Sequence, residues 1–431
     1  MRTQPVPNNN LINNSIITRE ALMIRRNSND LIKNISREYQ GQFAQTGAKI
    51  GSTINVRLPN DYVVQDGPLV NPEATAERSI PLTIAYRKNV PMAFSTQERT
   101  LNIDDFSERY IAPAVNALVG QVASDAMTLA LQASNMVVNT DDNGNLIAPS
   151  SQTWLQAKAI LTACNAPLDD RFAVLDPMTD ANTVAGMMGM FNPGNTVSRQ
   201  TTDGQMGSKI LGVREWMQDQ TVMISQTGSY DSKATATGTY GNYTPNGTPV
   251  TTISSSASPH SSALTVSAIN GTLNAGDIIT IAGVNRINRV NKNSLHIPQQ
   301  FVVLADCASG ATSIPLSPAI IPPGANGPVP YQTVDAAPAS GAAIKLVAPA
   351  GSIIRRNMLY SKRALTLATV DLENVSELGP LCARASLDGV SLRTVTYYNG
   401  SDDTRSTRLD VLYGIGMLRP DWCVIVPEVV S

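Results

Sequence analysis

The chain has 431 residues, of which 42% are hydrophobic and only 15% are charged, and its formal net charge is −2. The near-neutral charge excludes a global basic field that would attract nucleic acid. The low charge content, against ~25% in typical domains, predicts a polar surface suited to broad packing against neighbouring subunits. The length corresponds to about two to four domains.

The cysteines and the N-terminal sequence indicate a reducing compartment. Cys164, Cys307, Cys382 and Cys423 are far apart and form no CxxC pair, so we predict free thiols rather than a disulfide framework or a zinc site. The N-terminal stretch lacks the apolar core of a signal peptide. The sequence contains no run of about 18 apolar residues, so no transmembrane helix is predicted. We expect a protein that is made and assembled in a cytoplasm.

The N-terminal part predicts a polar arm, a helix and then a long hairpin. Apolar residues recur at helical spacing from Thr18 to Tyr39. This segment contains five basic and three acidic side chains. Within residues 44–100, the segments STINVRLP (52–59) and IPLTIAYRKNVPMAF (80–94) alternate as strands do. The apolar content of this hairpin is too small for a core of its own.

The strongest predicted helix lies between Asn102 and Val138. Its apolar residues form one long face, and Pro113 is expected to begin or kink its main stretch because proline cannot donate to the preceding turn. A helix of ~25 residues would be ~37 Å long, which is more than one small domain needs and is typical of a strut.

Helices and strands then alternate over residues 151–222. The segment 151–165 predicts a helix, 171–177 a strand and 178–191 a second helix. After an interruption, the C-terminal residues return to this mixed character and predict two strands around a turn at Asn399-Gly400.

The interruption runs from about Thr221 to Val347 and is rich in Ser, Thr, Gly and Pro. Short strands with turn signals between them predict a small antiparallel β-barrel, with strands at 263–268, 277–282, 300–306, 312–316 and 343–347. The segments on either side look incomplete alone, so we predict that this module is inserted into another domain.

One stretch of the inserted module, LNAGDIITIAGVNRINRVNK (273–292), predicts a strand, a turn and a basic loop. Ile279 and Ile281 are expected to face the barrel core, with glycines at the turns. The basic residues after the strand would suit phosphates, but no aromatic residue is interleaved with them to stack on bases. A solvated or subunit-facing loop is the favoured interpretation.

The sequence contains few motifs that are typical of catalytic or ligand-binding sites. The two histidines, His260 and His296, have no nucleophile-like context, and no serine-hydrolase elbow, phosphate loop, zinc helix or dinucleotide fingerprint is present. The stretch NTDDNGNL (139–146) vaguely resembles a calcium loop but has Ser150 where a glutamate is required, so a turn is favoured. We predict no catalytic residue, no cofactor and no metal site.

The order of these parts resembles the major capsid (coat) protein of tailed phages with the HK97-type fold, and more narrowly the podovirus coat proteins, which carry an inserted domain. The most specific segments are ALTVSAINGTLNAGDIITIAGVNRINRVNKN (263–293), QQFVVLADCASGATSIPLSPAI (299–320), RRNMLYSKRALTLATVDL (355–372) and RLDVLYGIGMLRPDWCVIV (408–426). These are packing and turn signatures rather than catalytic motifs, so the resemblance depends on their order and spacing.

The resemblance implies an α+β, HK97-type capsid fold with an inserted small antiparallel β-barrel. Its parts would be an N-arm with a helix (1–43), an E-loop hairpin (44–100), the spine helix of the P-domain (101–150), the first part of the A-domain (151–222), the I-domain (223–347) and a return segment that completes the P-domain and A-domain (348–431).

The resemblance also implies a structural function and no enzymatic one. Copies of the chain would form pentamers and hexamers of an icosahedral shell, with a scaffolding protein and a portal protein at one vertex. The shell would enclose double-stranded DNA without sequence specificity, would involve no membrane, and would assemble in the bacterial host cytoplasm before becoming part of the virion.

Loop position suggests candidate inter-subunit contacts, namely Arg87, Lys88, Asp61, Asp66, Glu73, Tyr240, Tyr243, Arg286, Arg289 and Lys292. Two features depart from the family pattern. Residues 232–262, the position of the family's acidic D-loop, have no acidic side chain, and the N-arm helix is mildly basic. A soluble nucleic-acid-binding β-barrel protein is the alternative, and a hydrolase with an unusual site is a third class.

Overall fold

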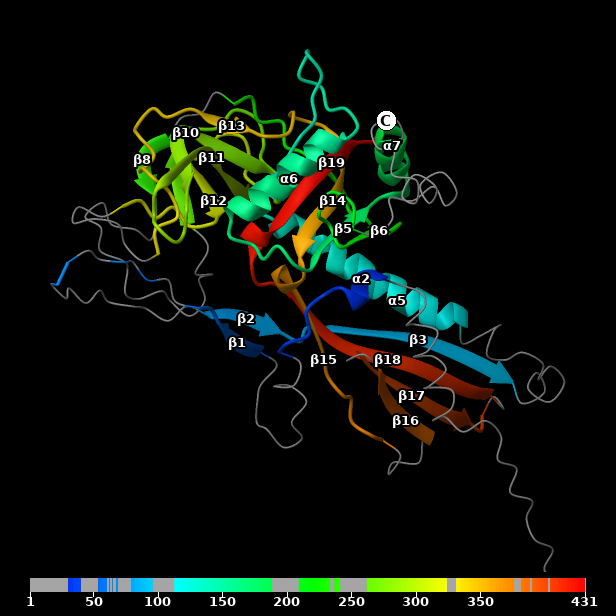
Figure 1. Ribbon diagram of the computed structural model, residues 1–431. Helices are drawn as coiled ribbons and strands as arrows, with labels where there is room; N and C mark the ends of the chain where they lie inside the picture. Colours follow the sequence, from blue (N-terminus) through cyan, green and yellow to red (C-terminus); the bar gives the residue numbers. More distant parts are fainter. Residues whose placement is uncertain are drawn as a thin grey trace, which may run out of the picture. The chain divides into compact units, whose positions relative to one another are not determined.

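The computed structural model describes residues 30–39, 53–59, 62, 64, 67–68, 79–95, 112–187, 209–232, 236–240, 262–323, 331–375, 381–387, 390–401 and 404–430 (Figure 1). The chain forms two compact units, each assembled from three separate segments. Unit 1 combines Met1–Ile54, Leu82–Asp125 and Thr366–Gly416, and unit 2 combines Asn55–Pro81, Ala126–Leu365 and Met417–Ser431.

Unit 1 contains a sheet of long antiparallel strands. Its order is β15 (Leu365–Thr369), β18 (Thr404–Met417), β17 (Val390–Asn399) and β16 (Leu381–Leu387), and β3 (Tyr86–Ser95) also pairs with β18. The two strands predicted around Asn399-Gly400 are β17 and β18, whose register runs from Asn399↔Thr404 to Arg393↔Asp410.

The predicted hairpin is present, but its second strand is divided between two sheets. β1 (Thr53–Arg57) pairs with β2 (Ser79–Thr83) in a two-stranded sheet. The alternation then continues into β3, which pairs with β18 over ten residues from Tyr86↔Tyr413 to Ser95↔Thr404. The alternating sequence fixes which side chains share a face but not which strand lies alongside, so the change of partner was not predicted.

The strut helix of unit 1 is α5 (Ala112–Met127), followed by the 3₁₀ turn η2 (Thr128–Gln132). Pro113 lies in the first turn, where a missing N–H costs nothing. The buried face of α5 and the short α2 (Asp30–Lys33) line an apolar cavity of about 20 Å³ with strands β15, β17 and β18. The predicted residues 102–111 lie outside the described residues.

The segment Pro113–Gln132 is also long and apolar enough to cross a membrane by length and composition, which a count of uninterrupted apolar residues did not predict. Just over half of its window, 56%, is buried inside the chain, and the core helix of a globular protein passes the same test.

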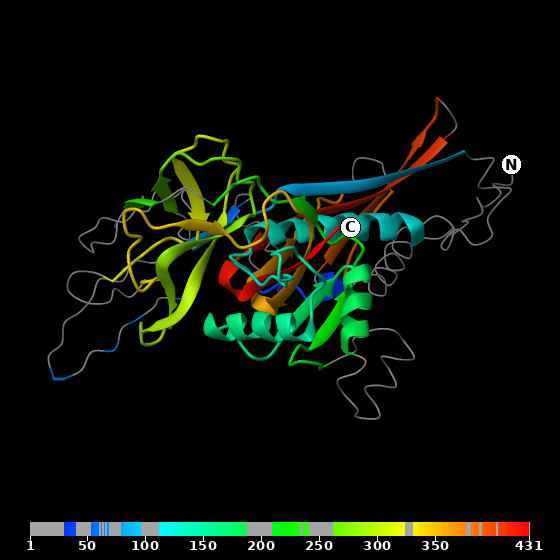
Figure 2. The same cartoon turned by 90° about the horizontal axis from the view of Figure 1, so that it is seen from above.

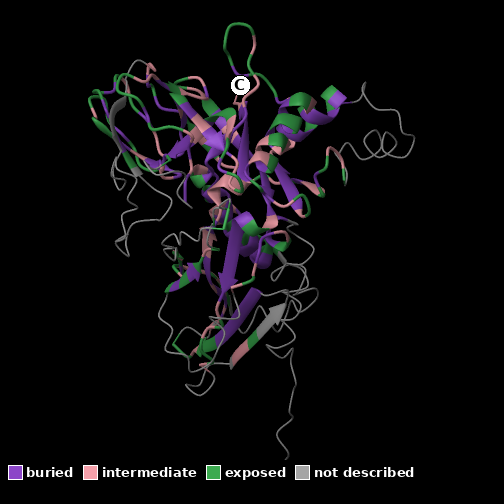
Figure 3. Ribbon diagram, turned by 60° about the vertical axis from the view of Figure 1, so that its left-hand side comes forward, coloured by how far each residue is buried: buried purple, intermediate pink, exposed green. Residues whose placement is uncertain are grey.

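The central sheet of unit 2 is mixed. Its order is β4 (Asn135–Met136), β19 (Cys423–Val429), β14 (Ile353–Ser361), β5 (Arg171–Leu175) and β6 (Glu215–Gln218), and β7 (Ile224–Gln226) also pairs with β14. The β14 pairs are antiparallel, whereas β4 with β19 and β5 with β6 are parallel. Strands β4, β5, β14 and β19 of this sheet are largely buried, in contrast to the exposed loops (Figure 3).

Helix α6 (Ser151–Ala163) lies beside this sheet in both views (Figures 1 and 2). It begins where predicted because Ser150 and Thr153 form a reciprocal capping box. Its Trp154 is buried and stands edge-on to Trp216 of β6, with ring centroids 5.1 Å apart. Helix α7 (Pro177–Met187) begins at Pro177, two residues after the end of β5 and one residue before the predicted start, because proline suits the first turn of a helix.

The inserted segment of unit 2 forms an antiparallel six-stranded sheet. Its order is β13 (Ile344–Leu346), β10 (Ile278–Ile287), β11 (Ser294–Val303), β12 (Ser313–Ser317), β9 (Ser262–Val266) and β8 (Ala236–Tyr240). All five predicted strands are present, and β8 was not predicted because its sequence ATGTY lies in a Ser-, Thr- and Gly-rich stretch that is typical of a loop. Among the described strands, no pairing joins β8 to β13.

The core of the inserted sheet agrees with the predicted orientation of β10. Ile279 and Ile281 are 0% and 2% exposed and belong to one apolar cluster with Phe301. Gly283, however, does not end the strand. It has φ +78° and lies where the β10–β11 register shifts between Thr280 and Asn285, which is the geometry of a β-bulge.

We predict that Ile279→Ala lowers the free energy of unfolding by about 2–5 kcal/mol, because the substitution leaves a cavity in a fully buried site. The measurement is the urea midpoint of the purified full chain. Ile297→Ala is the matched control, since Ile297 is 41% exposed, and it should change stability by no more than about 0.5 kcal/mol. Equal losses for both variants would contradict the assigned core.

Candidate subunit contacts and a polar seam

The candidate contact residues fall into three groups. Asp61, Asp66, Glu73 and Tyr243 lie outside the described residues. Tyr240 is the last residue of β8 and is paired with Leu264 of β9. The other five candidates are placed by β3 or by the hairpin of β10 and β11, and the two locations differ in character.

On β3, the neighbouring residues Arg87 and Lys88 point to opposite faces of the strand, as alternation requires. Arg87 is exposed, whereas Lys88 is half-buried. The Lys88 ammonium lies 3.1 Å from a carboxylate oxygen of Asp125 on α5. Arg87 therefore remains a candidate for contact with another subunit, and Lys88 has a partner within unit 1.

Asp125 is the centre of a small hydrogen-bonded cluster in unit 1. The Tyr413 hydroxyl donates to Asp125 Oδ2 at 2.6 Å and Gln121 Nε2 donates to Oδ1 at 2.8 Å. Partial burial raises the pKa of Asp125, but the hydrogen bonds from Tyr413, Gln121 and Lys88 outweigh it and hold that pKa below its ordinary value. Burial and the bond to Asp125 raise the pKa of Tyr413.

The structure corrects the prediction of an exposed basic loop after residue 283 in the inserted sheet. Arg286 lies within β10 and is only 4% exposed, and Lys292 in the following turn is 6% exposed. Arg289 forms an ion pair with Asp421. The strand continues past the bulge at Gly283, so the true turn lies at residues 288–293, where Asn288 N–H donates to the Asn293 carbonyl at 2.9 Å.

These side chains belong to a polar seam inside unit 2, which we define by Arg286, Arg289 and Gln300 on the inserted sheet and Asn135, Met136, Cys164 and Asp421 on the other side. Arg286 donates to Asn135 Oδ1 at 2.5 Å and to Cys164 Sγ at 2.6 Å. Burial raises the pKa of the Cys164 thiol, although the Arg286 charge opposes that effect. The seam joins the inserted sheet to α6 and β4.

Gln300 makes the most specific contact of the seam. Its side-chain amide donates to the Met136 carbonyl at 2.8 Å and accepts from the Met136 N–H at 2.8 Å. One glutamine side chain thereby pairs with the two backbone groups of Met136, much as a residue of a neighbouring strand would. No local sequence signal predicts this contact, because Gln300 and Met136 are 164 residues apart.

A second junction lies where the inserted segment begins and ends. The Gly351 N–H donates to the Gly228 carbonyl at 3.0 Å, so the incoming and outgoing chains run side by side. Asp277 Oδ2 accepts the Gly228 N–H at 2.9 Å, and Arg356 donates to the Gly276 carbonyl at 2.9 Å. Arg356 and Asp277 are both 1% exposed.

Burial is the largest influence on the pKa values of Arg356 and Asp277 at this junction. It lowers the pKa of Arg356 to about 10, while the Asp277 charge acts in the opposite direction. It raises the pKa of Asp277, with hydrogen bonds from Asn274 and Gly228 opposing. Gly276 has φ +91°, and a Cβ there would lie 2.5 Å from Leu131 Cδ2, so the Gly-Asp pair serves packing and turn geometry.

The calcium-like stretch at residues 139–146 is the turn that the sequence favoured. Asp141 Oδ1 accepts the N–H groups of Asn143 at 2.9 Å and Asn145 at 2.8 Å, and Thr140 and Leu146 form an antiparallel bridge. Within the described part of the chain, no group of three His, Cys, Asp or Glu side chains is arranged to hold a metal ion.

The family model of the P22 coat protein, gene protein 5, matches residues 64–425. The chain belongs to this coat-protein family. Its function is therefore that of a structural subunit of a phage capsid, with a mixed α/β capsid fold, and its location is the virion. The family resemblance predicted from the order of sequence elements is confirmed.

Solved structures similar to the chain include phage proteins. The chain is similar to a structure of Mycobacterium phage Che8, with 10% identity, 91% of this chain and 89% of that chain covered, and a TM-score of 0.44. The capsid of the cyanophage P-SCSP1u is similar at 11% identity, with coverage of 89% and 85% and a TM-score of 0.40.

The CUS-3 coat protein I-domain is similar at 32% identity, covering 30% of this chain and 97% of that chain with a TM-score of 0.18. No curated protein sequence matches the chain.

The Asp125 cluster predicts an acid-dependent contribution to stability. Because the folded-state pKa of Asp125 is lowered, its contribution is present above the ordinary carboxyl pKa of ~3.9 and is lost as the pH falls through the folded value. Lys88→Met should cost at most about 1 kcal/mol at pH 7, since the pair is partly exposed.

Urea midpoints measured from pH 7 to pH 2 test this. The difference between Lys88→Met and wild type should shrink toward zero in acid, and Arg87→Met, the adjacent exposed control, should show no such pH-dependent difference. A Lys88→Met difference that stays constant over the whole range would contradict the ion pair.

The seam gives a second prediction. Gln300→Leu should destabilise the chain by about 1–3 kcal/mol, because it leaves two backbone groups of Met136 without their partner. Hydrogen exchange of the Met136 amide should accelerate with it. Gln152→Leu, the same change at an exposed position of α6, is the control, and an unchanged Met136 exchange rate in Gln300→Leu would refute the contact.

Proposed function

We propose that the chain assembles into an icosahedral shell of pentamers and hexamers in the cytoplasm of a bacterial host. A scaffolding protein guides assembly, a portal protein occupies one vertex, and double-stranded DNA lies against the inner face without sequence-specific contacts. The single observation that carries this proposal is the coat-protein family match over residues 64–425.

We further propose HK97-type assignments for the parts of the chain. Residues 1–43 are the N-arm, 44–100 the E-loop, and 101–150 the spine-helix segment of the P-domain. Residues 151–222 and 348–431 supply the A-domain and complete the P-domain, and 223–347 are an I-domain whose antiparallel strands belong to a small barrel. The antiparallel pairing of neighbouring strands in the sheet β13-β10-β11-β12-β9-β8 supports the last assignment.

Exposed side chains of the unit 1 sheet support contact with neighbouring subunits. On β3, Arg87, Asn89 and Pro91 are exposed. At the end of β17, Tyr397 and Tyr398 are 50% and 60% exposed. Tyrosine and arginine are enriched in protein interfaces, since they combine apolar area with hydrogen-bonding groups. We assign these residues to contacts between copies of the chain.

Assembly of the purified full chain, alone and with its cognate scaffolding protein, tests the function by negative-stain electron microscopy. Shells should form with the scaffolding protein. Arg87→Glu should lower the shell yield roughly tenfold, which corresponds to about 1.4 kcal/mol of lost contact energy, without changing the urea midpoint of the free subunit.

Lys345→Glu, the same charge reversal on an exposed strand position outside the proposed contacts, is the matched control and should assemble normally. A wild-type chain that stays unassembled under both conditions contradicts the proposed function. Normal assembly of Arg87→Glu contradicts only the assigned contact.

A further inference from the structure

Arg286 is a buried cation that has no counter-charge among the described residues. Its side chain donates to the neutral Asn135 amide and to the Cys164 sulfur, and its Nε has no hydrogen-bond partner. Among the described residues, no carboxylate lies within ion-pair distance of it. An uncompensated buried charge is costly, so a group other than the described residues is expected to neutralise it.

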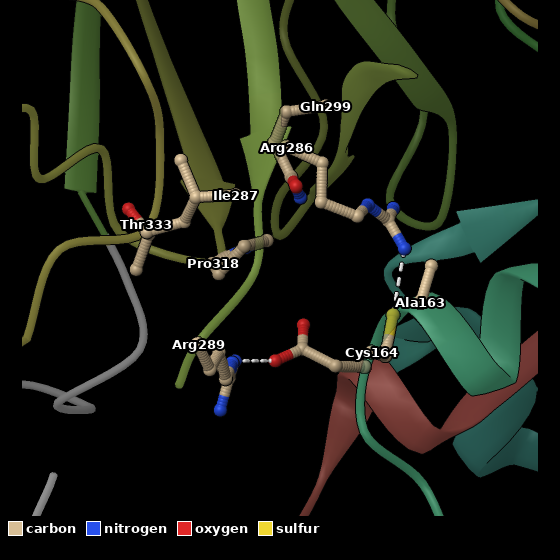
Figure 4. Close-up of a pocket in the computed structure, with 9 residues that line it drawn as sticks. Ala163, Cys164, Arg286, Ile287, Arg289, Gln299, Pro318 and Thr333 are labelled. Carbon is tan, nitrogen blue, oxygen red and sulfur yellow. Dashed lines mark hydrogen bonds and ion pairs between the residues drawn. The ribbon is translucent and has the colours of Figure 1, made fainter. Parts of the chain in front are cut away.

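A cavity lies directly beside this guanidinium (Figure 4). Its volume is about 20 Å³, enough for one particle of roughly the size of a water molecule. Arg286 and Arg289 enter it from the inserted sheet and Cys164 from the end of α6 (Figure 4). Gln299 and Thr333 are further polar residues of its wall.

The charged side chains that line the cavity have a net charge of +1. Two guanidinium groups, those of Arg286 and Arg289, and one carboxylate, that of Asp421, line the cavity. The ion pair of Arg289 with Asp421 accounts for one of each. The remaining charge belongs to Arg286, a residue that is 4% exposed and whose buried Nε has no hydrogen-bond partner.

We propose that this cavity binds a single monatomic, monovalent anion, chloride under ordinary conditions, against the guanidinium of Arg286. A water molecule would satisfy the Nε donor but would leave the charge uncompensated. The small volume of about 20 Å³ favours a monatomic ion over a phosphate or carboxylate ligand. The bound anion thereby stabilises the seam that joins the inserted sheet to α6 and β4.

The test is the thermal unfolding of the full chain in sodium chloride, sodium bromide and sodium gluconate at equal ionic strength. A halide that binds only the folded state at ten times its dissociation constant raises the folding equilibrium constant about elevenfold. The midpoint should therefore be higher in chloride and bromide than in gluconate. Equal midpoints in the three salts would overturn the proposal.

Arg286→Gln should abolish the difference between halide and gluconate. Arg214→Gln, which removes an arginine from the ion pair with Asp170 outside the seam, should retain it and so corrects for general salt effects. A halide difference that is unchanged in Arg286→Gln contradicts the site.

If Arg286→Gln does not fold, the test is anomalous diffraction at the bromine edge from crystals of the wild-type protein in sodium bromide, which locates bound bromide. A bromide peak beside Arg286 Nε supports the proposal, and a water molecule or no density at that position overturns it.

Discussion

Strand β14 is the constraint on which the structure of unit 2 depends. It pairs with β19 from the C-terminal part of the chain, with β5 after α6, and with β7, which precedes the strands of the inserted sheet. Three segments that are far apart in the sequence thus take their register from one strand. Because most of β14 is buried, a slip by one residue would turn its apolar side chains to the wrong face, and the register is strongly specified.

The inserted sheet is attached to this framework by directional contacts rather than by apolar area alone. Gln300 matches both backbone groups of Met136, and Arg289 pairs with Asp421. Hydrogen bonds and ion pairs have strict geometry, so they favour one orientation of the inserted sheet over others that would bury similar area. In a coat subunit, which must present the same surfaces in every copy, such fixed orientation is directly useful.

Local patterns were sufficient to locate α6, β5, α7 and the core of β10, because capping residues, prolines and alternation act over a few residues. They could not identify the partner of β3, since alternation carries no information about which strand lies alongside. The sequence predicts a loop at Arg286 because Gly283 is typical of a turn, whereas a bulge lets the strand continue. Local patterns could not predict the contacts of the seam, since the residues in each pair are more than a hundred positions apart.

The inserted segment enters and leaves through chains that are already hydrogen-bonded to each other. The Thr227 N–H donates to the Ser352 carbonyl at 2.9 Å, directly after β7 and before β14. Joining these two points by a tight turn would convert β7 and β14 into an ordinary hairpin. The strand connections in the rest of unit 2 are thus complete without the module, so its removal would leave the order of the central sheet unchanged.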